Sequence, residues 1–193
     1  MHTVEKFTSA DLALMPDDNN RYEIIEGELY VSRAPSREHQ YACLRICRFL
    51  DEWNDQTGLG IALPAPGLIF GDDDDVIPDV IWISRARAAT AFDEAGHLIA
   101  APELTVEVLS PGRANEFRDR EAKLDLYSRR GVEEYWIVDW ILRTVEIYRR
   151  NTDQLSLSET LRDGDSIKSP LLPDFACAVS SLFLIPPMRQ TQS

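Results

Sequence analysis

The sequence lacks any apolar run near the ~20 residues that span a bilayer, and no apolar secretory segment follows its N-terminus. We therefore expect a cytoplasmic protein without a membrane segment. Hydrophobic residues make up 44% of the 193 positions, which is enough to bury a core without disulfides or a structural metal. No linker rich in proline, glycine or serine divides the chain, which favours one domain over residues 1–193.

Cysteine is scarce, and no CxxC or Cys/His spacing typical of a zinc site is evident. Cys43 and Cys47 lie four residues apart on an expected helix, and Cys177 stands alone, so we expect reduced, buried thiols. The sequence also has no GxSxG motif, and its histidines lie in polar, loop-like contexts. Both absences argue against a hydrolase with a serine or cysteine nucleophile.

Basic residues are in deficit, because 20 lysines and arginines face 33 acidic residues and give a net charge of −13. Nucleic-acid-binding proteins usually present a basic surface, so this balance argues against a nuclease. One basic face can nevertheless coexist with an acidic remainder, and acidic clusters can hold divalent cations. The run Asp72–Asp75 lacks the alternating ligands and the glycine of a calcium loop, so we expect a solvated turn there.

The hydrophobic pattern predicts an α/β fold. Apolar runs on both sides of Glu26 and Gly27 indicate a β-hairpin, and Gly58 and Gly131 are placed to end two helices. The expected elements are, in order, a short helix at 10–15 capped by Ser9, a hairpin at 21–32, a helix at 37–56, strands at 61–70, 76–83 and 104–109, a helix at 115–130, strands at 134–140, 144–149 and 155–161, and a tail at 171–184 that packs back through Phe175, Leu182 and Phe183. A helix that links two strands of one sheet implies a mixed sheet with helices on both faces.

Two carboxylates interrupt apolar strands. Strand alternation places Asp79 on the same face as Ile81, and Glu107 on the same face as Thr105. An ionised carboxylate in such surroundings is costly unless it is paired or bound to a metal. Two carboxylates on adjacent strands can hold Mg²⁺ at ~2.0–2.1 Å. The alternatives are that Asp79 caps a backbone amide and that Glu107 forms a structural ion pair with an arginine.

Lys123 is the third unusual residue. On a helical wheel it falls inside the apolar arc of Phe117, Leu124 and Tyr127, although Arg120 intrudes on the same arc. A lysine in that position either extends outward to solvent or meets acidic groups on the sheet. Asp119, one turn earlier, is an alternative partner for it.

Four fragments carry a family resemblance: YEIIEGEL, IPDVIWIS, PELTVEVLSPG and REAKLDLYSRRGVEEYWIVD. Their order and spacing, from about Tyr22 to Phe183, resemble the Uma-two family of restriction endonucleases in the PD-(D/E)XK nuclease superfamily. The resemblance implies a restriction endonuclease-like core of helix, three strands, helix and strand, with an N-terminal hairpin and extra C-terminal strands. It also implies a Mg²⁺-dependent phosphodiesterase site.

The resemblance assigns catalytic positions residue by residue. Pro78 and Asp79 match the PD element, and Glu107 matches the acidic position. Leu109 stands where the motif expects lysine, and members of this family supply that lysine from the following helix, where Lys123 lies. The implied catalytic set is therefore Asp79, Glu107 and Lys123, with Mg²⁺ or Mn²⁺ held by the two acids.

Two further positions fall where the family has functional residues. Glu28 resembles an additional hairpin acid and is a further candidate metal ligand. The alternative is that it is charged for solubility alone, as residues near turns often are. His39 lies near the start of the first long helix, where the family tends to place a histidine. We expect His39 to be a capping or surface residue and not a catalytic one.

The expected function is a Mg²⁺-dependent endonuclease that hydrolyses DNA phosphodiester bonds, as a homodimer because cutting both strands needs two sites. The alternative is a nuclease-fold module that binds or scaffolds with little turnover, which the acidic balance and the displaced lysine favour. DNA contacts are expected from Arg113, Arg118 and Arg120, with Arg85, Arg87, Arg129 and Arg130 nearby. Each of these arginines is alternatively part of a solvated surface of mixed charge.

Overall fold

A mixed six-stranded sheet forms the centre of the computed structural model, which describes residues 6–185. The strands, in the order in which they lie side by side, are β10 (Gln154–Leu161), β9 (Thr144–Asn151), β8 (Glu134–Asp139), β7 (Leu104–Val108), β6 (Val80–Ser84) and β3 (Gly60–Pro64). β7 and β8 are parallel and the other neighbours are antiparallel, so the sheet is mixed, as predicted.

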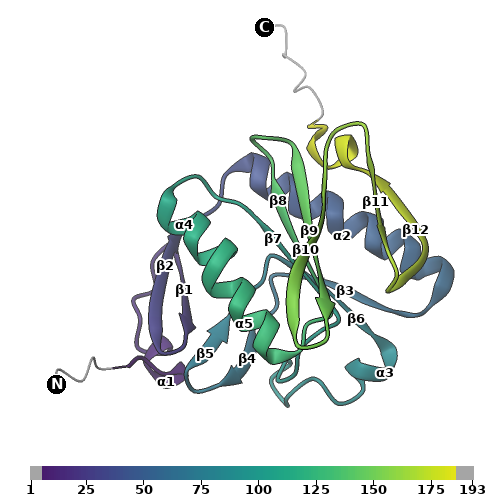
Figure 1. Cartoon of the computed structure of the whole chain (residues 1–193). Coiled ribbons are helices and arrows are strands. Elements are labelled where there is room, and N and C mark those ends of the chain that lie inside the picture. Colours follow the sequence, from purple (N-terminus) through teal and green to yellow (C-terminus); the bar gives the residue numbers. More distant parts are fainter. Residues whose placement is uncertain (1–5, 186–193) are drawn as a thin grey trace, which may run out of the picture.

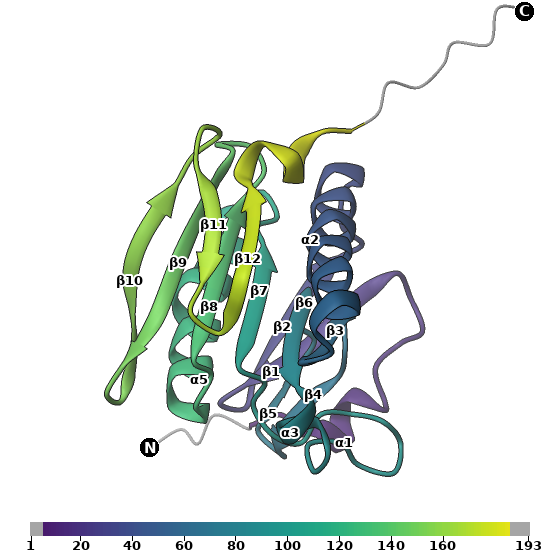
Figure 2. The same cartoon turned by 90° about the vertical axis from the view of Figure 1, so that its right-hand side faces the viewer.

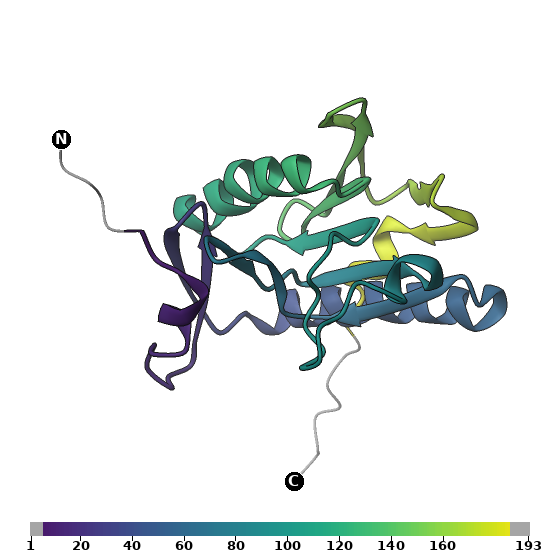
Figure 3. The ribbon, with the colours of Figure 1, turned by 90° about the horizontal axis from the view of Figure 1, so that it is seen from below.

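Helices cover both faces of this sheet. The long helix α2 (Arg37–Thr57) lies on one face, and α5 (Lys123–Arg130) lies on the other (Figures 1 and 3). Short helical segments are α1 (Ser9–Leu12), α3 (Arg85–Ala88), α4 (Arg113–Phe117) and the 3₁₀ turn Val179–Phe183. Within residues 6–185, no helix is long and apolar enough to cross a membrane. The predicted α/β architecture is confirmed.

Two smaller sheets flank the centre (Figure 2). One contains β2 (Glu28–Arg33), β1 (Asn20–Ile25), β5 (Asp74–Val76) and β4 (Leu68–Gly71), and the other pairs β11 (Ser166–Ser169) with β12 (Leu172–Ala178). The predicted hairpin is confirmed as β1 and β2, which turn at Glu26 and Gly27 with φ of 53° and 77°. Phe175 and Leu182 pack into the core, as expected for the tail.

The alternation of side chains along the central strands divides the core into two layers. Trp82 of β6 packs with Leu50 on the side of α2. The neighbouring Ile81 packs instead with Leu126 and Tyr127 on the side of α5. This is the alternation predicted from the sequence, which places Asp79 on the same face as Ile81.

The ends of α2 follow its sequence. Ser36 is the N-cap, and its side chain accepts a hydrogen bond from the backbone N–H of His39 at 3.2 Å. Gly58 ends the helix in the left-handed region at φ 64°, where glycine has no steric penalty. The cap holds the first turn of α2, and with it His39, in a fixed position.

Two predicted strands are each divided in the structure. The segment 61–70 becomes β3 and β4 in different sheets, because the chain bends at Ala65, whose φ is 47°. The segment 76–83 becomes β5 and β6, since Pro78 lies between them and cannot donate to a sheet. At the first bend, the Ala65 N–H donates to the backbone carbonyl of Asp79. This hydrogen bond fixes the bend beside Asp79.

The prediction of a solvated turn at Asp72–Asp75 is wrong for Asp74. Its side chain is 2% exposed, and its carboxylate accepts the Glu26 N–H at 2.8 Å and pairs with Arg130. The reason is that β5 pairs with β1, so this part of the acidic run lies inside the smaller sheet. Asp74 thus ties the hairpin turn to α5.

The helix predicted at 115–130 contains a π-helical segment, Arg118–Ala122, between α4 and α5. A π-turn contains more residues than an α-turn, so a wheel with a constant step cannot be carried through it. Phe117, which the wheel placed on the buried face, is 56% exposed, whereas Lys123 is completely buried. The wheel was right for Lys123 and wrong for Phe117.

Gly60 begins β3 and pairs with Ser84 of the neighbouring antiparallel strand β6. A Cβ at this position would lie 2.4 Å from the Ile83 carbonyl oxygen and 2.6 Å from the Trp82 ring. We predict that Gly60→Ala lowers the free energy of unfolding by about 1–3 kcal/mol through overpacking. Urea denaturation tests this, with Gly164→Ala as the control because a Cβ there meets nothing within 4 Å. Equal midpoints for the two variants would contradict the prediction.

Candidate active site

Asp79 immediately precedes β6, and the sheet register places it beside Glu107. Val80 pairs with Val106 across the antiparallel strands β6 and β7, so the preceding residue of one strand faces the following residue of the other. The Val108 N–H donates to Asp79 Oδ2 at 2.9 Å. The backbone of β7 therefore fixes the Asp79 carboxylate next to Glu107.

Both oxygens of Asp79 have side-chain partners as well. Arg21 Nη1 lies 3.0 Å from Oδ1, and His39 Nε2 lies 3.0 Å from Oδ2. Burial would raise the pKa of Asp79, but the hydrogen bond and charge of His39, together with Arg21, hold that pKa well below its usual range. Asp79 is therefore an ionised carboxylate at 5% exposure.

Glu107 and Lys123 form a buried pair. Lys123 Nζ lies 2.9 Å from Glu107 Oε1, and the Tyr127 hydroxyl donates to the same oxygen at 2.8 Å. Burial raises the pKa of Glu107 to about 8, and the Lys123 charge offsets this only in part. Burial would lower the pKa of Lys123, but Glu107 and Glu23 raise it above its ordinary value. The proton therefore stays on the amine.

Glu23 completes the surroundings of Lys123 and was missed in the sequence. It lies on β1 at 1% exposure, with Oε1 2.7 Å from Lys123 Nζ. The same oxygen accepts the Ile77 N–H at 2.8 Å. The sequence does contain an indication that Glu23 is buried. Glu23 is directly followed by the apolar residues Ile24 and Ile25, much as Glu107 lies within an apolar strand.

Glu28, the hairpin acid chosen from the sequence, is not brought to this cluster. Its side chain is exposed and accepts a hydrogen bond from the Tyr30 hydroxyl at 3.2 Å. The hairpin register pairs Glu28 with Ile25 at the turn, whereas Glu23 lies two residues farther from the turn, beside the central sheet. The structure thus offers Glu23 in place of Glu28.

His39 is buried at 4% exposure, so the expectation of a capping or surface side chain is wrong. Its Nδ1 lies 3.6 Å from Cys43 Sγ, four residues later on α2. Ligand atoms of His39, Cys43 and Asp79 all lie within 4.8 Å of one another, although no zinc-like spacing was recognised in the sequence. The two ring nitrogens face different partners, and this geometry describes a hydrogen-bonded chain from Cys43 through His39 to Asp79.

Most of the arginines expected to contact DNA are already paired. Arg118 is buried at 7% exposure with its Nε 2.8 Å from Asp119 Oδ1, and Arg120 is bonded to Glu146. Arg87, Arg129 and Arg130 also pair with carboxylates, whereas Arg113 and Arg85 have exposed side chains. The expectation of a surface role is therefore wrong for Arg118, because the π-helical segment turns this residue inward.

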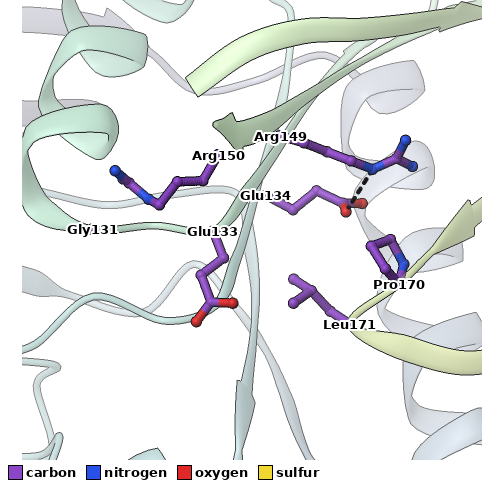
Figure 4. Close-up of a pocket in the computed structure, with 7 residues that line it drawn as sticks. All are labelled: Gly131, Glu133, Glu134, Arg149, Arg150, Pro170 and Leu171. Atoms are coloured by element: carbon purple, nitrogen blue, oxygen red, sulfur yellow. Dashed lines mark hydrogen bonds and ion pairs between the residues drawn. The ribbon is translucent and has the colours of Figure 1, made fainter. Parts of the chain in front are cut away.

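A separate cavity of about 530 Å³ lies at the start of β8 and is shown in Figure 4. It is lined by Gly131, Glu133, Glu134, Arg149, Arg150, Pro170 and Leu171. Glu134 pairs with Leu104, three residues before Glu107 along β7, and none of Asp79, Glu107 and Lys123 lines the cavity. Arg149 Nε is already bound to Glu134 Oε2 at 3.1 Å.

The cluster has a donor set that suits a hard divalent cation. Asp79 and Glu107 supply carboxylate oxygens from neighbouring strands, as Mg²⁺ prefers. Glu107 Oε1 accepts two hydrogen bonds, whereas none of residues 6–185 donates to Oε2. The structure therefore brings Asp79, Glu107 and Lys123 together. It leaves Glu107 Oε2, beside Asp79, available to a cation.

Because Lys123 is completely buried between two carboxylates, it contributes to stability. We predict that Lys123→Ala lowers the free energy of unfolding by about 3–5 kcal/mol, because it leaves buried acids without their cation. Urea denaturation measures the loss. Lys168→Ala, at an exposed lysine of β11, is the matched control and should leave the midpoint unchanged. A Lys123→Ala protein as stable as the control would show that this ion pair is dispensable to the fold.

Comparisons with known proteins agree with this architecture. A solved structure described as "a putative nuclease belonging to DUF820", from Anabaena variabilis, has a TM-score of 0.73 and 19% sequence identity, covering 92% of this chain and 97% of that one. A search of curated proteins found no match. The family described as "Uma2: Putative restriction endonuclease" matches residues 9–180. The chain therefore belongs to the Uma2 family.

Proposed function

We propose that this protein is a Mg²⁺-dependent endonuclease that hydrolyses DNA phosphodiester bonds. The observation that carries the proposal is the Lys123 amine 2.9 Å from Glu107, which itself lies beside Asp79 on the neighbouring strand. An acid pair can hold a divalent cation, and an adjacent ammonium can stabilise the negative charge that develops on a phosphate. Membership of the Uma2 family supports the same reaction.

In the proposed mechanism, Asp79 and Glu107 hold the divalent cation, which when bound polarises the scissile phosphate and lowers the pKa of a bound water. Lys123 stays protonated, because its pKa is raised by Glu107 and Glu23. A fixed ammonium offsets negative charge that develops on the phosphate, so its role is electrostatic and not that of a general base. Glu23 holds the amine in place from the side of the hairpin.

A second candidate is a nuclease-fold module that binds without turnover. The specific observation in its favour is that both Asp79 oxygens are already bound by Arg21, His39 and the Val108 N–H. A site neutralised by its own side chains is stable without a cation. The displaced lysine of the motif points the same way, since Leu109 occupies the usual position.

Plasmid cleavage with Mg²⁺ or Mn²⁺, against an EDTA control, separates the two candidates. We predict that Asp79→Asn and Glu107→Gln each reduce the cleavage rate by about 10²-fold or more, because each replaces a carboxylate ligand of the cation with a weaker amide ligand. These near-isosteric changes keep the side-chain volume, and circular dichroism checks that the variants fold.

Glu28→Gln is the matched control for the acid substitutions. It also removes one glutamate charge, but from an exposed position on the hairpin, so cleavage should continue at the wild-type rate. Loss of activity in Glu28→Gln, or full activity in Glu107→Gln, would show that the site is misassigned. If the wild-type protein cleaves no DNA with either metal, the module that binds without turnover is favoured.

A further inference from the structure

Arg21 is a partly exposed cation at an otherwise buried cluster. It lies on β1 with 24% of its side chain exposed, and only Nη1 is engaged, by Asp79 Oδ1 at 3.0 Å and by the Ile77 carbonyl at 3.3 Å. Among residues 6–185, none accepts a hydrogen bond from its Nε or Nη2. Nη1 is therefore bound to Asp79, a proposed cation ligand, whereas Nε and Nη2 are available to another acceptor.

The two oxygens of Asp79 are held in different ways. Oδ2 is held by the Val108 N–H of the central sheet and by His39, whose side chain is 5% exposed. The Val108 N–H belongs to the backbone of β7, and the His39 side chain is enclosed on the buried face of α2. Oδ1 is held by Arg21, whose long side chain reaches solvent at the edge of the hairpin. Arg21 is thus the one releasable partner among these three.

The local position of Arg21 also suits a phosphate. Arg21 and Glu23 alternate to the same face of β1, and Glu23 contacts Lys123, so Arg21 lies on the side of the cluster that carries the amine. A guanidinium binds phosphate through paired N–H donors, and it is more easily desolvated than an ammonium. Arg118 does not fill this role, because it is 7% exposed and both its Nε and its Nη2 donate to Asp119.

Resting on the proposed function, we propose that Arg21 binds a phosphate of the nucleic-acid substrate and that Asp79 holds it only in the free protein. When Arg21 turns to the phosphate, Asp79 Oδ1 loses a positively charged neighbour and becomes a better cation ligand. Substrate and cation then favour each other's binding. Arg21 therefore competes with the cation before DNA binds and contributes to the site afterwards.

The first test is calorimetric titration of the DNA-free protein with Mn²⁺. Arg21→Gln keeps a polar side chain but removes the charge beside Asp79 Oδ1, so Mn²⁺ should bind about tenfold more tightly. The matched control is Arg33→Gln, an exposed arginine on the partner strand β2, which changes the net charge equally and should leave the affinity unchanged. Weaker Mn²⁺ binding in Arg21→Gln would overturn the proposal, because Arg21 would then only position Asp79.

The second test measures binding of a short DNA duplex by fluorescence anisotropy over a range of salt concentrations. Ca²⁺ is supplied as the cation, and a gel checks that the duplex stays intact. Loss of one phosphate contact should weaken binding by about tenfold in Arg21→Gln and lower the slope of log affinity against log salt by about one. Arg33→Gln should keep the wild-type slope.

The outcomes separate this inference from the proposed function. If the wild type cleaves DNA but Arg21→Gln matches Arg33→Gln in both titrations, the role of Arg21 is refuted and the nuclease stands. If the wild type binds DNA with the Arg21-dependent slope but does not cleave it, the nuclease fails and the phosphate contact stands. If the wild type binds no DNA, both proposals fail.

Discussion

The neutralisation of buried charge is the constraint on which the rest of this structure depends. Carboxylates at Glu23, Asp79, Glu107 and Asp119 are almost completely withdrawn from solvent. An isolated charge in such a position costs several kcal/mol or more, so each must find a cation or hydrogen-bond donors inside the protein. The partners come from different elements: the hairpin supplies Arg21, α2 supplies His39, and the segment after α4 supplies Arg118 and Lys123. The network therefore joins the hairpin, the sheet and helices on both faces.

The same network links stability to the proposed chemistry. Lys123 is held by Glu23 and Glu107, and Asp79 is held by His39 and the Val108 N–H. These contacts keep the reactive groups in fixed orientations, which a catalytic centre needs before its substrate arrives. They also leave the site stable without an added ion. The same contacts thus stabilise the fold and hold the two acids in position.

The sequence was sufficient for the fold class and for residues whose surroundings are local. Glu107 could be found because it interrupts an apolar strand, and Lys123 because helical spacing places it inside an apolar arc. Glu23 was overlooked in favour of Glu28, because the choice depends on which end of the hairpin meets the central sheet. The burial of His39 was missed for a similar reason, since it depends on how α2 packs against Asp79 at the start of β6. Contacts between distant elements are not encoded in local periodicity.

The π-helical segment Arg118–Ala122 lets this helix hold one residue more than a regular α-helix of the same span. In a regular helix, an added residue rotates every later side chain by ~100° about the axis. The wide turn absorbs that residue, so Lys123 still meets Glu107 on the sheet. Deletion of one residue from the segment, with closure to an α-turn, would therefore leave the amine beside the acids. The segment thus makes the charge pairing at the sheet tolerant of a change in chain length at this point.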